Sequence, residues 1–177
     1  MQLYKKMNSK EKFLALIFKN PTRKFHIREF ARESKLNPNT VLSLINTFQS
    51  EGIIVLEKKR HITEFSANLD SQQYFTKKRI FNLSQLYDSG LVDFLEKNYS
   101  PETICVMGSY SRGEDIERSD IDLVLIGKNQ KEFNLSKFEK FLSRKIHLIL
   151  TDYKNMSKEF YNNLINGVVL SGYLEVK

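Results

Sequence analysis

The chain has 177 residues, of which 41% are apolar and 28% charged, and it carries a net charge of +7. This composition is typical of a protein with packed cores. No apolar run approaches the roughly 20 residues that span a bilayer, and the first residues lack the pattern of a signal peptide. The single cysteine, Cys105, cannot form an intrachain disulfide. These features argue against a membrane-spanning or disulfide-stabilised secreted protein, and we expect a cytoplasmic one.

The charge is distributed unevenly along the chain. Residues 1–70 contain 13 Lys and Arg against 7 Asp and Glu, whereas residues 101–177 contain 11 of each. This asymmetry indicates two modules with different partners, and a basic module favours polyanions. We expect an α+β protein with one domain over residues 1–69, a helical connector over 70–100 and a second domain over 101–177.

The basic part shows three helical segments followed by a hairpin. We expect helices over residues 10–19 and 28–34, and a third helix that Asn37 caps and Pro38 opens. Apolar residues of the third helix recur at helical spacing, which leaves a polar face of Asn39, Thr40, Ser43, Asn46 and Thr47. Strands over 53–56 and 62–66 then form a hairpin whose tip, residues 57–61, is basic.

This order resembles winged helix-turn-helix transcription regulators, above all in the string NPNTVLSLINTFQSEGIIV. The resemblance implies double-stranded DNA as partner, with the polar helix face in the major groove and Lys58, Lys59 and Arg60 on phosphates. The exposed face of that helix has no Arg or Lys, which predicts weak direct readout of guanine. Winged helices also serve as protein-interaction or dimerisation modules, and this alternative stays open.

The connector is apolar for a linker. We expect one helix over about residues 71–88 and a second before Tyr99-Ser100-Pro101. Its many large apolar side chains must pack against a domain, the other module or a second copy of the chain, so a homodimer is one of the expected arrangements.

The neutral part alternates strands and helices. We expect buried strands over residues 103–107, 121–126 and 145–150, helices over 132–142 and 156–165, and an extended segment over 167–176. Between the first two strands lies the stretch VMGSYSRGEDIERSDIDLVLIG, residues 106–127. Its Gly108-Ser109 pair lets the backbone approach a ligand closely, and a helix beginning at Tyr110 favours an anion such as phosphate.

Two aspartates, Asp120 and Asp122, stand one residue apart at the start of the second strand. The alternation of side chains along a strand puts both carboxylates on one face. Two carboxylates this close repel each other unless a cation lies between them, and Mg²⁺ held by one or two carboxylates and substrate phosphates fits this pattern. The stretch therefore predicts a nucleotide site.

The string GSYSRGEDIERSDIDLVL resembles the signature of the DNA polymerase β nucleotidyltransferase superfamily, and the minimal nucleotidyltransferases in particular. The resemblance covers about residues 101–177 and implies a small mixed-sheet fold. It implies that Gly108 and Ser109 contact the phosphates of an NTP, that Asp120 and Asp122 bind Mg²⁺, and that Arg112 supports the phosphate or the turn. The same family includes antitoxins that act with HEPN-type toxin proteins.

His147 departs from the family pattern. Family members use a third carboxylate on the next strand, where this chain reads RKIHLI over residues 144–149. His147 can serve as a base near neutral pH, another acid such as Asp152 or Glu175 can replace the lost one, or transfer is weakened while nucleotide binding persists. An odd spacing along the strand argues against Asp152. The loss of the acid favours a DNA-binding regulator that binds Mg-NTP; the alternative is an active nucleotidyltransferase with a hydroxyl acceptor.

Overall fold

We analysed a computed structural model of the chain, which describes residues 7–59, 62–128, 131 and 133–175. The chain divides into two compact units, Met1–Lys78 and Arg79–Lys177. The division falls inside the residues of helix α4 (Gln72–Asp88). The residues of the predicted connector are therefore shared between the units, since Tyr74 packs against Phe18 of the first unit and Leu86 belongs to the core of the second.

The first unit contains the three predicted helices, α1 (Ser9–Lys19), α2 (Ile27–Ser34) and α3 (Pro38–Ser50). Local hydrogen bonds define where α1 and α3 begin. Asn8 and Glu11 form a reciprocal capping box at the start of α1. The Asn37 side chain accepts from the backbone N–H of Asn39, and Pro38 occupies the first turn of α3 as predicted.

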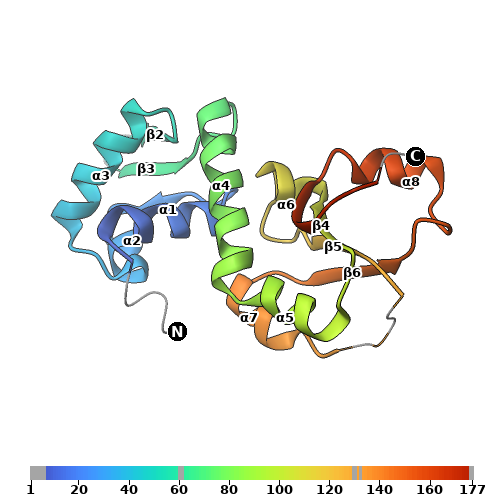
Figure 1. Cartoon of the computed structure of the whole chain (residues 1–177). Coiled ribbons are helices and arrows are strands. Elements are labelled where there is room, and N and C mark those ends of the chain that lie inside the picture. Colours follow the sequence, from blue (N-terminus) through green and yellow to red (C-terminus); the bar gives the residue numbers. More distant parts are fainter. Residues whose placement is uncertain (1–6, 60–61, 129–130, 132, 176–177) are drawn as a thin grey trace. The chain divides into compact units, whose positions relative to one another are not determined.

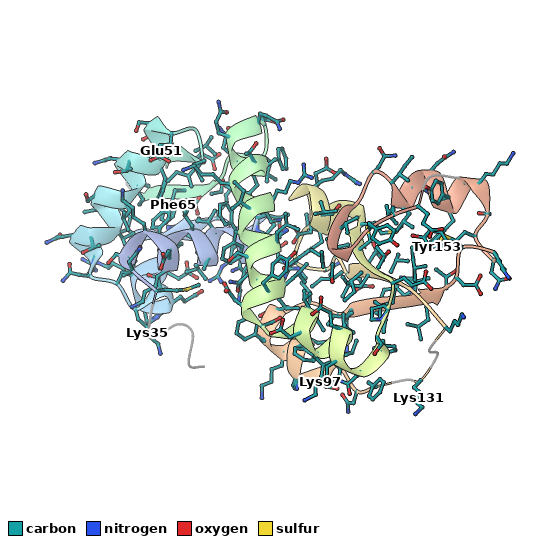
Figure 2. All side chains as sticks on the ribbon, viewed as in Figure 1. Lys35, Glu51, Phe65, Lys97, Lys131 and Tyr153 are labelled. Atoms are coloured by element: carbon teal, nitrogen blue, oxygen red, sulfur yellow. The ribbon has the colours of Figure 1, made fainter. Side chains whose placement is uncertain are left out.

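Three short strands complete this unit: β1 (Phe25–His26), β2 (Ile54–Lys59) and β3 (Ile62–Ala67). They form an antiparallel sheet in the order β1-β3-β2. Its core is built from phenylalanines of the helices and of the sheet, including Phe65, which Figure 2 labels; the others are Phe13, Phe25, Phe30 and Phe48. The unit therefore has a hydrophobic core of its own.

The predicted hairpin tip is wrong in its extent. Lys58 and Lys59 pair with Thr63 and Ile62 in the β2–β3 ladder, so the strands continue beyond residue 56. Arg60 and His61 lie outside the described residues, as do the side chains of Lys58 and Lys59.

The second unit is built on a four-stranded mixed sheet in the order β6-β5-β4-β7. Its strands are β4 (Thr103–Met107), β5 (Ile121–Ile126), β6 (Ile146–Thr151) and β7 (Val168–Gly172). β5 and β6 run parallel, while β4 runs antiparallel to both β5 and β7. The helices are the C-terminal part of α4, α5 (Leu91–Tyr99), α6 (Gly108–Arg112), α7 (Ser136–Leu142) and α8 (Lys158–Leu164).

Both faces of this sheet are covered, as Figure 1 shows for α5 and α7 on one side and α8 on the other. Ile121 and Leu123 belong to the core cluster that contains α5 and α7, whereas Val124 and Cys105 belong to the cluster that contains α8. Burial on both faces explains why the strands read as almost continuous apolar runs. Desolvation of the buried Cys105 thiol raises its pKa to about 11, which fits its predicted packing role.

Two helices of this unit are shorter than predicted. Residues 133–135 precede α7 and are not helical, because the Asn134 side chain accepts from the backbone N–H of Ser136 and forms a turn there. Residue 132, where we predicted the helix to begin, lies outside the described residues. α8 begins at Lys158 rather than Met156, since the Ser157 hydroxyl caps it by accepting from Phe160 N–H.

In the described part of the chain, no helix is both long enough and apolar enough to cross a membrane. This agrees with the absence of a long apolar run in the sequence.

Candidate functional site

The turn between β4 and α6 brings Gly108 against Asp122. Gly108 has a φ of +73°, and a Cβ atom at this position would lie 2.6 Å from Asp122 Oδ2. Two independent constraints therefore require glycine here: the left-handed backbone conformation, and the close approach of a carboxylate to the backbone. Gly108 of the Gly-Ser pair therefore lies directly against Asp122, the second aspartate of the motif.

Strand register aligns three residues across the sheet. Met107, Asp122 and His147 are partners in the β4–β5 and β5–β6 pairings. Asp122 Oδ1 lies 3.1 Å from Nδ1 of His147, and the two side chains are 34% and 62% exposed. When Nδ1 carries the proton, the imidazole donates to the carboxylate. His147 therefore lies on the strand where the family resemblance implies a third carboxylate, and it contacts Asp122, which was expected to bind the metal.

Asp120 directly precedes β5 and is exposed. Ile121 between the two aspartates is fully buried, and its backbone N–H donates to the carbonyl of Lys145 across the sheet at 2.8 Å. The buried Ile121 fixes the alternation, so Asp120 and Asp122 belong to the opposite face of the strand. The site residues are held at the edge where β4 ends and β5 and β6 begin.

Ser109 and Arg112 both belong to α6. Ser109 is partly buried, and its carbonyl accepts from Glu114 N–H at 2.9 Å. Nε of Arg112 lies 2.7 Å from Glu114 Oε2 in an exposed ion pair, directly beyond Gly113, which closes the helix with a φ of +77°. Arg112 is thus linked to Glu114 in the turn that follows α6.

A buried polar network behind the turn was not predicted from the sequence. Asn82 Nδ2 donates to Asp115 Oδ1 at 2.7 Å and to the Tyr110 carbonyl at 3.0 Å. Nη2 of Arg144 donates to Asp115 Oδ2 at 3.3 Å, and the two side chains are only 5% and 1% exposed. Burial raises the pKa of the Tyr110 phenol, whose O–H donates to the Asn82 carbonyl at 3.4 Å.

This network connects the loop between β4 and β5, which carries the sequence motif, to other elements of the second unit. It links α4, α6, the loop after α6 and the residues before β6. Additional hydrogen bonds offset part of the cost of burying an ion pair. Asn82 donates one to Asp115, and Nη1 of Arg144 donates to the Ser143 carbonyl at 3.0 Å. The sequence signal was weak, since Asp115 and Arg144 read as ordinary surface charges and lie 29 residues apart.

The predicted DNA-contacting residues of α3 share one helix face. Val41, Leu44, Ile45 and Phe48 are buried, whereas Asn39, Ser43 and Asn46 are exposed and Thr40 and Thr47 are partly exposed. Thr47 Oγ1 donates to the Ser43 carbonyl at 3.1 Å, so its hydroxyl already has a partner within the helix. The polar face predicted from the sequence is thus available to a partner of the first unit.

The described residues of the site supply few ligands for a divalent metal ion. Among the residues that the structure describes, no group of three or more His, Cys, Asp and Glu side chains is placed to hold one. Asp120 and Asp122 supply two carboxylates. That donor set fits Mg²⁺ when phosphate oxygens and water complete the octahedron, as is usual for Mg²⁺ in nucleotide sites.

Comparison with known proteins supports one class. Residues 89–169 match the family model described as nucleotidyltransferase domain. This match supports the assignment of this part of the chain to the nucleotidyltransferase superfamily, and it includes Gly108, Ser109, Asp120, Asp122 and His147. The comparisons with curated proteins and with solved structures gave no match.

Proposed function

We propose that the protein is a DNA-binding regulator whose nucleotidyltransferase domain binds Mg-NTP and transfers nucleotidyl groups poorly. The observation that carries the proposal is the contact between Asp122 and His147, 3.1 Å from Oδ1 to Nδ1, at the place where the family has a third carboxylate. An imidazole adds no negative charge to the site. It also competes for an oxygen of the aspartate that is expected to bind the metal.

The residues at this edge of the sheet have different expected roles. Gly108 leaves space for a ligand and for Asp122, and Ser109 contributes a hydroxyl and a backbone N–H to the phosphates. Asp120 and Asp122 would hold Mg²⁺, which neutralises phosphate charge when bound. The resemblance implies that the missing carboxylate helps to activate an acceptor hydroxyl, so its loss should weaken transfer more than nucleotide binding.

The basic first unit supports the regulatory part of the proposal. Residues 1–70 have a net charge of +6 by the sequence, and α3 presents a face of short polar side chains. Short polar groups can reach base edges from a helix in the major groove, and basic side chains nearby neutralise phosphates. We therefore expect double-stranded DNA as the partner of this unit.

The test of this function is DNA affinity measured with and without Mg-NTP. A regulator that responds to nucleotide must bind DNA with different affinities in the two states, because a ligand shifts an equilibrium only by its differential affinity. Equal DNA affinity at saturating Mg-NTP would contradict the regulatory role while leaving nucleotide binding intact.

A second candidate function is active transfer of a nucleotidyl group from an NTP to a hydroxyl acceptor, in particular on a HEPN-type protein partner as an antitoxin. The exposed imidazole of His147, which contacts Asp122, favours it because such a group can take a proton from the acceptor. Incubation with each NTP labelled at the α-phosphate and a candidate HEPN protein distinguishes the two functions. Incorporation of label into the HEPN protein over repeated turnovers would favour the active enzyme.

A further inference from the structure

A cavity of about 490 Å³ lies beside Asp120 in the second unit. Its walls come from the loop before β5, from α7 and from the residues that lead into β6. The volume is within the range of roughly 300–1,000 Å³ that is common for small-molecule sites. The described lining residues include Asp120 but not Gly108, Ser109 or Asp122, so the cavity adjoins the predicted NTP site without coinciding with it.

Two cations of the cavity lining make no ion pair with a described residue. Among the described residues, the lining carries four cations and three carboxylates, Glu117, Asp120 and Glu139. One carboxylate, Glu139, already accepts from Ile146 N–H at 3.1 Å and from Lys145 Nζ at 3.4 Å. The buried Arg144 is bound to Asp115. In contrast, Arg118 and Lys140 are exposed and make no ion pair with another residue in the described part of the chain.

Hydroxyl groups accompany these two cations. Ser119, Ser136 and Ser143 line the same cavity. Ser119 Oγ accepts from Ile116 N–H at 3.0 Å, which leaves its O–H free to donate to a ligand. Two cations without an ion pair to a described residue and several hydroxyl donors around one cavity form the kind of donor set that holds a phosphate group.

We propose that this cavity binds the phosphate of a second molecule, a phosphomonoester, beside the Mg-NTP site. Because like charges repel, the phosphate lies toward Arg118 and Lys140 rather than against Asp120. The proposal goes beyond the regulatory function and requires neither NTP nor metal. It gives the protein two adjacent phosphate-binding positions, one that depends on the aspartates and one that does not.

The test is a titration of the full-length protein with inorganic phosphate and with ribose 5-phosphate, followed by amide chemical shifts. We expect saturable shifts at Ser119, Lys140 and Ser143. The Arg118→Ala/Lys140→Ala double variant should bind roughly tenfold more weakly or worse, as expected for the loss of charge-assisted hydrogen bonds. A charge-matched control, Lys154→Ala/Lys158→Ala, removes two exposed lysines that do not line the cavity and should bind as the wild type does.

Each outcome of this titration either supports or overturns the proposal. Unsaturable shifts in the wild type, or equal weakening in the control variant, would overturn the proposal by showing that phosphate responds only to net charge. Tighter binding of ribose 5-phosphate than of inorganic phosphate would support a phosphate carried on a larger molecule. Equal or tighter binding of inorganic phosphate would overturn the phosphomonoester assignment.

Two further measurements distinguish this phosphate site from the predicted NTP site. Asp122→Asn should abolish Mg-NTP binding and leave phosphate binding unchanged, because Asp122 does not line the cavity among the described residues. Phosphate binding should also persist at saturating Mg-NTP. Displacement of phosphate by Mg-NTP would contradict a separate site and would show that the cavity receives the phosphates of the NTP itself.

Discussion

Asp122 and His147 are partners on the parallel strands β5 and β6, and the Asp122 carboxylate lies between the imidazole on one side and Gly108 on the other. Oδ1 is 3.1 Å from His147 Nδ1, and Oδ2 would be 2.6 Å from a Cβ atom on Gly108. Both oxygens of one aspartate are thus constrained by residues of the neighbouring strand ends. This relationship determines how the site responds to substitution.

Replacing His147 with aspartate should restore the third carboxylate. We expect metal-dependent nucleotidyl transfer to rise by about 10²-fold, the order of a general acid–base contribution. Without metal, the new carboxylate faces Asp122 across the strands and should destabilise the protein by up to about 1 kcal/mol. Single-turnover transfer and thermal unfolding with and without Mg²⁺ measure both effects. The control is His147→Asn, and a His147→Asp variant no more active than this control would mean that the missing acid is not the defect.

Gly108→Ala should damage the turn in two ways. The left-handed φ of +73° alone costs about 1 kcal/mol for a residue with a side chain. The contact with Asp122 Oδ2 adds to this and must move the carboxylate. The control is Gly90→Ala, since Gly90 has the same φ of +73° and no atom within 4 Å of its added Cβ. Urea unfolding should show a larger loss for Gly108→Ala, and only that variant should lose NTP binding. Equal losses in both measurements would contradict the Gly108–Asp122 relationship.

Asp115→Ala should be among the most destabilising substitutions in the second unit. The substitution removes one partner of a buried ion pair, so Arg144 and Asn82 lose their contacts with the Asp115 carboxylate. Such a loss typically lowers the free energy of unfolding by about 3–5 kcal/mol. The neighbouring Glu114→Ala removes an exposed partner of Arg112 and should cost less than about 1 kcal/mol. Chemical denaturation of both variants checks the difference. Similar stabilities would show that the buried network does not hold the loop after α6.

Lys58, Lys59 and Arg60 should contribute to DNA affinity through phosphate contacts. Alanine at all three positions should weaken binding to any duplex and reduce the slope of log K against log salt by up to about three. A charge-matched control in the second unit, Lys97→Ala/Lys154→Ala/Lys158→Ala, should leave that slope unchanged. A wild-type protein that does not bind duplex DNA at low salt would remove the DNA-binding hypothesis.

The bounds of two strands in the second unit could be predicted from the sequence. β4 and β5 have the predicted bounds because β-branched and apolar residues fill them, apart from Asp122, and turn residues flank them. The buried face of α3 was also predictable, since Val41, Leu44, Ile45 and Phe48 recur at helical spacing. Local periodicity and local turn chemistry are sufficient for these features.

Other features could not be predicted from residue spacing, because a local turn or contacts between distant residues determine them. Phe133 and Leu135 continue the helical spacing of α7, yet they precede the helix because Asn134 forms a turn with Ser136. Asn82, Asp115 and Arg144 come together only through the tertiary fold, and nothing in their local sequence marks them as buried. The Asp122–His147 contact required the β5–β6 register, which a single sequence does not specify.

Calorimetric titration of the protein with each NTP, with and without Mg²⁺, tests the central claim most directly. The wild type should bind at least one NTP only when Mg²⁺ is present, and Asp120→Ala/Asp122→Ala should abolish that binding. A charge-matched control, Asp93→Ala/Glu159→Ala, removes exposed acids from α5 and α8 and should bind as the wild type does. NTP binding that is absent from the wild type, or that survives loss of both aspartates, would contradict a nucleotide site at Gly108, Asp120 and Asp122.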